Sequence, residues 1–185
     1  MRDLLDDYSA LTATGTPVGR AVVTSVWGSA PRPEGACMLA TPDGRLAGSV
    51  SGGCIEGAAA TEIAEAIARG TPKLVAFGVS DERAWEVGLS CGGTIKVFIE
   101  PAVHPEILAA ARGEGGVVAA TLIRSDSPAT PVGSMAVIGE DGTAAASATW
   151  LDESVISAAL CVAAPAGRGR LRSPGRFMEI SSRSP

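Results

Sequence analysis

The stretch Gly48-Ser49-Val50-Ser51-Gly52-Gly53-Cys54-Ile55-Glu56-Gly57 decides how the first half of this chain folds. After Cys54, apolar residues recur at helical spacing, which predicts a helix over Glu56–Arg69. The Gly52-Gly53 pair predicts a tight turn before this helix. Because glycine has no Cβ, the backbone at this turn can also come close to a bound group. We therefore expect Cys54 at or near the N-cap of the helix.

That position would give the Cys54 thiol a chemical role. The unpaired N–H groups and the dipole of a helix N-terminus favour a negative group, either a thiolate or a phosphate. A thiol held there has a lowered pKa and is a better nucleophile or metal ligand. The alternative is that Cys54 is a small buried residue at a tight turn. A second cysteine beside a Gly-Gly pair, in Ser90-Cys91-Gly92-Gly93, favours the functional interpretation.

The segments on either side predict short strands joined by turns. Residues 18–26 are rich in β-branched residues, and 94–100 alternate between apolar and other side chains. Pro42-Asp43-Gly44 predicts a hairpin turn between strands at 37–40 and 45–50. A further strand is expected at 73–77.

Arg32 lies between two prolines in the loop that follows the first strand. The prolines favour an extended backbone at Arg32, so its guanidinium is directed and suited to pair with a carboxylate or a phosphate. The alternative is a surface arginine that bonds to Glu34 or Glu56.

The second half of the sequence repeats features of the first half. Gly133 aligns with Gly35, Asp141-Gly142 with Asp43-Gly44, and Ser147 with Ser49, all at one constant offset. We predict an α+β fold in one domain, 1–185, built of two related strand-hairpin-helix lobes at 16–100 and 113–180. Their sheets are expected to be mixed, with the helices packed outside. In the second copy Asp152 takes the place of Cys54, which predicts that only the first copy carries a site.

Composition excludes several classes of protein. The chain has 185 residues, 46% of them hydrophobic and 19% charged, which is typical of a globular protein. The net charge of −5 argues against a nucleic-acid surface. There is no run of 18 apolar residues and no signal segment, so we expect a cytoplasmic protein without a membrane association. The four cysteines form no CxxC pair and His104 is the only histidine, which argues against zinc-ribbon, thioredoxin-like and Ser-His-Asp sites.

Three motifs in one order resemble the XdhC/CoxI family: Gly28-Ser29-Ala30-Pro31-Arg32-Pro33-Glu34-Gly35, then Gly48 to Glu56, then Gly88-Leu89-Ser90-Cys91-Gly92-Gly93-Thr94. The resemblance implies an accessory protein that binds molybdenum cofactor (molybdopterin) transiently and hands it to an apo molybdenum hydroxylase of the xanthine dehydrogenase or carbon monoxide dehydrogenase type. It also implies help from a cysteine desulfurase in sulfuration. Longer members carry a C-terminal Rossmann-like domain, whereas no strand followed by GxGxxG occurs here. We expect the N-terminal domain alone, with a Rossmann-domain partner supplied separately or not needed.

The resemblance and the residues together suggest where the cofactor would bind. Cys54 and Cys91 are candidates for contact with molybdenum or sulfur, and Arg32 for the phosphate. The amides of Gly52, Gly53 and Cys54 are candidates for the phosphate or an oxo group. The full set of candidate cofactor-binding residues is Arg32, Ser51, Gly52, Gly53, Cys54, Glu56, Ser90, Cys91, Gly92 and Gly93.

Two other functions remain open on this sequence. One is a thiol-dependent enzyme with Cys54 as nucleophile, for which only Glu56 with a raised pKa or the distant His104 is available as a base. The other is a redox switch through a Cys54–Cys91 disulfide, which requires the two Cα atoms to come within about 7 Å. We favour a maturation factor over an enzyme, and we expect a homo-oligomer because the alanine-rich helices leave apolar faces to cover.

Overall fold

The computed structural model describes residues 1–78, 93–113, 117–125, 129, 131–139, 144–145 and 177–181. The chain divides into two compact units, Leu4–Val103 on the one hand and Met1–Asp3 with His104–Pro185 on the other. The division at Val103 falls between the two expected lobes, 16–100 and 113–180. The predicted α+β class is confirmed, with both units combining sheet and helix.

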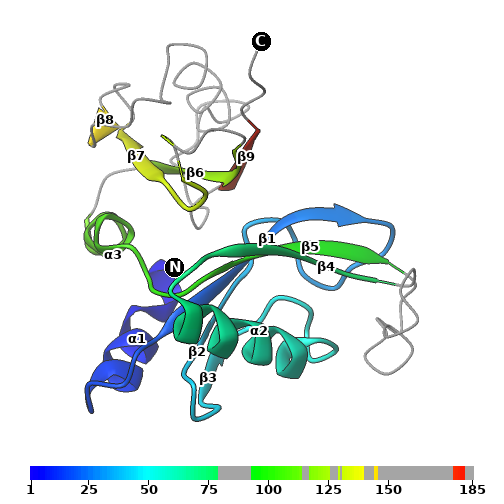
Figure 1. The fold of residues 1–185 in the computed structure, drawn as a ribbon, viewed down its shortest axis with the longest axis horizontal. Helices are drawn as coiled ribbons and strands as arrows, with labels where there is room; N and C mark the ends of the chain where they lie inside the picture. Colours follow the sequence, from blue (N-terminus) through cyan, green and yellow to red (C-terminus); the bar gives the residue numbers. More distant parts are fainter. Residues whose placement is uncertain are drawn as a thin grey trace. The chain divides into compact units, whose positions relative to one another are not determined.

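The larger unit is built on a five-stranded sheet in the order β3-β2-β1-β5-β4 (Figure 1). Its strands are β1 (Gly19–Trp27), β2 (Cys37–Ala40), β3 (Leu46–Gly48), β4 (Lys73–Phe77) and β5 (Thr94–Glu100). All neighbours pair antiparallel. The expectation of a mixed sheet is therefore wrong for this unit, because β4 pairs with its successor β5, and β5 returns antiparallel along β1.

Helix α2 (Glu56–Arg69) covers one face of this sheet (Figure 1), and its bounds are those predicted from the sequence. Ala59, Ile63 and Ala66 are buried on the inner side of the helix. They share a core cluster with inward-facing residues of the sheet, namely Ala21, Val23, Met38, Ala40, Ile95, Val97 and Ile99. The helix ends at Gly70, whose φ of 66° and N–H bond to the Ile67 carbonyl form a left-handed cap.

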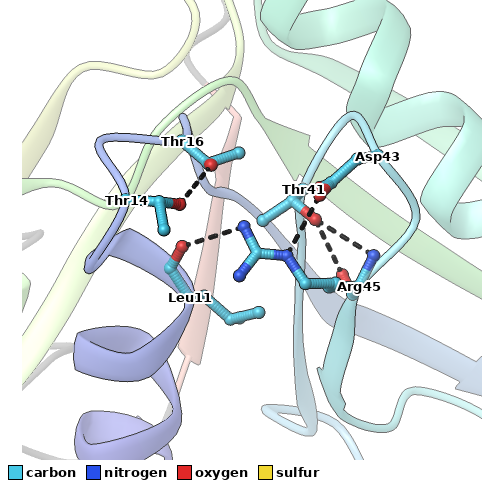
Figure 2. Close-up of polar contacts among 6 residues, drawn as sticks. All are labelled: Leu11, Thr14, Thr16, Thr41, Asp43 and Arg45. Atoms are coloured by element: carbon cyan, nitrogen blue, oxygen red, sulfur yellow. Dashed lines mark hydrogen bonds and ion pairs between the residues drawn. The ribbon is translucent and has the colours of Figure 1, made fainter.

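The β2–β3 hairpin is fastened to the end of α1 (Leu5–Thr12), which follows a short 3-10 turn, η1 (Arg2–Leu4). Figure 2 shows Arg45 donating from Nη2 to the Leu11 carbonyl at 3.3 Å and from Nε to Asp43 Oδ2 at 3.1 Å. The Arg45 N–H donates to Thr41 Oγ1 at 3.0 Å and closes the turn. The predicted hairpin is confirmed, but its return strand is shorter than the expected 45–50. The Val50 N–H donates to a Glu56 carboxylate oxygen, not to a neighbouring strand.

The smaller unit contains a four-stranded sheet in the order β8-β7-β6-β9. Its strands are β6 (Val117–Arg124), β7 (Met135–Gly139), β8 (Ala144–Ala145) and β9 (Phe177–Ser181), of which β9 runs parallel to β6. Helix α3 (Pro105–Arg112) begins with a proline at its first position, where a missing N–H costs nothing. None of the helices in the described ranges has the length and hydropathy to cross a bilayer.

The two units share one turn geometry. In the larger unit, the Gly35 N–H donates to the Val23 carbonyl, the Val23 N–H to Ala36, and the Ala36 N–H to Pro33. The same three bonds recur in the smaller unit, with Gly133, Leu122, Ser134 and Pro131 in the corresponding places. Gly35 and Gly133 have φ values of 82° and 92°, which only glycine adopts readily. The duplication itself stays a prediction, because Asp152, which takes the place of Cys54 in the second copy, lies outside the described residues.

Candidate functional site

The glycine-containing motifs meet where β1 ends and β5 begins in the larger unit. A Cβ on Gly52 would lie 3.4 Å from Cβ of Pro31, so the second motif packs on the first. A Cβ on Gly93 would lie 2.3 Å from the Ser29 carbonyl oxygen, so the last glycine of the third motif also abuts the first. Ser90, Cys91 and Gly92 lie outside the described residues. The structure thus brings together the two complete motifs and Gly93.

The loop before α2 makes its turn on two glycines. Gly52 and Gly53 have φ values of 77° and 114°, a backbone region that other residues rarely adopt, and both are exposed. Ile55, fully buried, is the N-cap of α2, so Cys54 precedes the cap by one residue. The Cys54 side chain is half-buried and packs against the core cluster between α2 and the sheet. The thiol therefore stands at the boundary between the core and the exposed Gly52-Gly53 backbone.

The carboxylate of Glu56 turns back from the first position of α2 into this loop. Its Oε1 accepts hydrogen bonds from Ser49 Oγ at 2.6 Å, the Val50 N–H at 3.2 Å and the Ser51 N–H at 2.9 Å. Its Oε2 accepts from Ser51 Oγ at 2.6 Å, the Gly53 N–H at 2.9 Å and the Ile55 N–H at 3.2 Å. One side chain thereby holds together the loop on both sides of Gly52.

The two serine hydroxyls extend this network. Each gives its hydrogen to Glu56 and accepts an amide hydrogen in return, Ser49 Oγ from Gly52 at 2.8 Å and Ser51 Oγ from Ile55 at 2.9 Å. Burial raises the pKa of Glu56, but the hydrogen bonds from Ser49 and Ser51 outweigh it and lower the pKa to about 2. The carboxylate is therefore charged at neutral pH.

This network changes what is expected of the loop amides. The sequence suggested Gly52 and Gly53 as donors to a cofactor phosphate or oxo group. In the structure these N–H groups donate to Ser49 Oγ and Glu56 Oε2 respectively. Ser49 is not among the residues predicted for the site. The pattern that could have revealed the network is an acidic residue at a helix start, preceded by serines and glycines.

Arg32 is exposed beside the loop. Its Nε donates to the Ser49 carbonyl at 3.4 Å, which links the first motif to the second. The two carboxylates expected as alternative partners bond elsewhere, with Glu34 accepting from the Val26 N–H and Glu56 from its own loop. Among the described residues no carboxylate forms an ion pair with Arg32, whose side chain is exposed.

The other described cysteine, Cys37, lies in β2 and differs from Cys54. Burial raises the pKa of its thiol, although the neighbouring Arg20 guanidinium works in the opposite direction. This keeps Cys37 protonated and makes it a poor nucleophile. Within the described ranges no group of three or more His, Cys, Asp or Glu residues is placed to hold a metal ion.

Comparisons with known proteins agree with the resemblance. Residues 11–78 match the XdhC and CoxI family. The chain is 39% identical over 104 residues to the molybdenum cofactor insertion chaperone PaoD of Escherichia coli K12, covering 52% of this chain and 32% of that protein. It is 35% identical over 82 residues to a probable xanthine dehydrogenase subunit of Bacillus subtilis 168, covering 43% and 25%. The chain thus spans about a third or less of these two relatives.

A solved structure has a similar fold. The crystal structure of a xanthine dehydrogenase from Bacillus halodurans superposes with a TM-score of 0.58 at 28% sequence identity. The match covers 77% of this chain and 43% of the other.

Proposed function

Since residues 11–78 match the XdhC and CoxI family, we propose that this chain binds molybdenum cofactor transiently and helps its maturation and insertion into a molybdenum hydroxylase. The name of the Bacillus subtilis relative favours a target of the xanthine dehydrogenase type over one of the carbon monoxide dehydrogenase type. The observation that carries the proposal is a loop that holds a half-buried thiol beside exposed glycine backbone and packs on the first motif, which Gly93 of the third motif also abuts.

The residues at this loop fit the chemistry of such a cofactor. Bound molybdenum cofactor supplies a soft metal–sulfur centre and a phosphate, which call for a thiolate and a cationic donor. Cys54 is the thiol that we propose for the metal–sulfur end, with Cys91 as a second, and Arg32 is the exposed guanidinium that we propose for the phosphate. Gly52 and Gly53 present backbone without side chains, so a large group can approach Cys54 closely.

The proposed partners follow from the same resemblance. A cysteine desulfurase would provide the sulfur for the cofactor, and the apo-hydroxylase would receive it. We further propose that a Rossmann-domain polypeptide and a second copy of this chain take part in the assembly.

A thiol-dependent enzyme is less well supported by the geometry. Cys54 would need a base, and the sequence offered Glu56 provided that its pKa was raised. The pKa of Glu56 is instead lowered to about 2, so this carboxylate accepts no proton from a thiol near neutral pH. The Cys54–Cys91 redox switch involves a residue outside the described part of the chain.

Co-expression with a hydroxylase of the xanthine dehydrogenase type tests the proposal. In a host whose own family members are deleted, we expect this chain to raise both the molybdenum content and the xanthine-oxidising activity of the purified hydroxylase. Cys54→Ala should remove that gain, because it deletes the thiol and keeps the serine hydroxyls and amides that donate to Glu56.

Cys37→Ala is the matched control, since its thiol lies within β2 and outside the loop, and it should retain the gain. If the hydroxylase acquires as much molybdenum and activity without the chain as with it, the proposal is contradicted.

A further inference from the structure

The centre of the loop at residues 49–55 is an anion that belongs to the chain itself. Each oxygen of the Glu56 carboxylate accepts three hydrogen bonds, from Ser49 Oγ, Val50 N and Ser51 N on one side and from Ser51 Oγ, Gly53 N and Ile55 N on the other. We infer that Glu56 is a positioning residue whose carboxylate closes this loop and thereby fixes Cys54 beside the core. The inference rests on the proposed function only in taking Cys54 as the cofactor-facing thiol.

The donors around Glu56 require a charged acceptor. Every group that faces the two oxygens is an N–H or an O–H, and hydrogen bonds to an ionised carboxylate are about twice as strong as bonds between neutral groups. A glutamine in the same place would point its NH2 group at three donors, which leaves them unpaired. Charge as well as shape is therefore needed to close the loop.

Cys54 is tied to this network from both sides along the chain. Gly53 donates to Glu56 Oε2 at 2.9 Å immediately before it. Ile55 donates to Ser51 Oγ at 2.9 Å and to Glu56 Oε2 at 3.2 Å immediately after it. When the carboxylate is removed, the backbone on both sides of Cys54 loses its anchor. The half-buried thiol should then become more accessible to solvent.

The same network bears on where a cofactor phosphate binds. Two of the amides that the sequence suggested for an anion are already bonded, Gly53 to Glu56 and Gly52 to Ser49 Oγ, and the Glu56 charge disfavours a second anion at the same place. We therefore expect the phosphate to bind away from the amides of residues 50–55, at the exposed guanidinium of Arg32.

Chemical rescue of Glu56→Ala tests the inference. We would measure the rate at which iodoacetamide alkylates Cys54, resolved from the other cysteines by peptide mass spectrometry. Glu56→Ala should raise this rate about tenfold or more, because one hydrogen bond to a charged group is worth roughly that factor. Added sodium acetate should bring the rate back toward that of the wild type by supplying the missing carboxylate. Acetamide and sodium chloride at the same concentration should not.

Two variants make the result decisive. Glu56→Gln should also raise the rate, but acetate should leave it unchanged because the glutamine side chain fills the space. Glu65→Ala, which removes an exposed carboxylate from the same helix, should label like the wild type.

The inference is overturned if Glu56→Gln labels like the wild type, or if acetate and acetamide act alike on Glu56→Ala. A Glu56→Ala protein that does not fold leaves the decision to Glu56→Gln. The assay contains no cofactor, so its outcome is independent of whether the chain binds molybdopterin.

Discussion

Glu100→Leu is expected to lower the free energy of unfolding by about 3–5 kcal/mol, because it leaves the Arg20 guanidinium buried without its counter-charge. Arg20 in β1 lies opposite Glu100 in β5, and Arg20 Nε is 2.5 Å from Glu100 Oε2. The two side chains are only 6% and 4% exposed. Burial lowers the pKa of Arg20, but the Glu100 charge, the charge at Cys37 and the hydrogen bond to Glu100 together outweigh it, and the net shift is upward. Arginine is effectively always protonated in proteins, so the guanidinium stays charged when its partner is removed. Urea denaturation of both proteins measures the loss.

The double variant Arg20→Met/Glu100→Leu distinguishes two causes of the lost stability, an unpaired buried charge and a loss of packing. Replacing a buried ion pair by apolar side chains of similar volume is often close to neutral, so the double variant should recover most of the lost stability. A double variant as unstable as Glu100→Leu would contradict this account of the pair.

Gly48→Ala is expected to destabilise the larger unit by about 3–4 kcal/mol, as the sum of backbone strain and a steric clash. Gly48 has a φ of 77°, and a Cβ placed on it would lie 2.4 Å from the Cys37 carbonyl oxygen in β2. That oxygen accepts the Ser49 N–H, so neither backbone can move away without breaking the entry to the loop. Thermal and urea unfolding report the change.

Gly44→Ala provides the matched control for the backbone strain. Gly44 has a similar φ of 86°, but nothing lies within 4 Å of a Cβ built there. Its substitution should cost only the strain of a left-handed backbone, about 1–2 kcal/mol. Equal losses in the two variants would show that the clash at Gly48 is relieved at no cost.

Local patterns predicted most of the larger unit. The bounds of α2 and of the strands β2, β4 and β5 agree with the sequence prediction, because each is bounded by glycine, proline or a change of periodicity. The hairpin at Pro42-Asp43-Gly44 was equally clear. The resemblance to the XdhC and CoxI family that the sequence motifs indicated is confirmed for residues 11–78.

Contacts between side chains and distant backbone could not be predicted in the same way. Glu56 was expected to bind a cofactor, and only the folded loop shows that its carboxylate accepts the surrounding amides. The pairing of Arg20 with Glu100 joins residues that are 80 positions apart. The proposed roles of Cys54, Cys91 and Arg32 stay predictions. Ligand binding leaves no periodic signal in a sequence from which such roles could be assigned.

The most direct test of the proposed function is the cofactor content of the purified chain. We would express wild type and Cys54→Ala in a host that makes molybdenum cofactor, and assay molybdopterin and molybdenum per chain. We expect both to be bound to the wild-type protein and to be largely lost from Cys54→Ala. Wild-type protein without cofactor, or a Cys54→Ala protein that retains as much as the wild type, would contradict the assignment of this loop as the cofactor site.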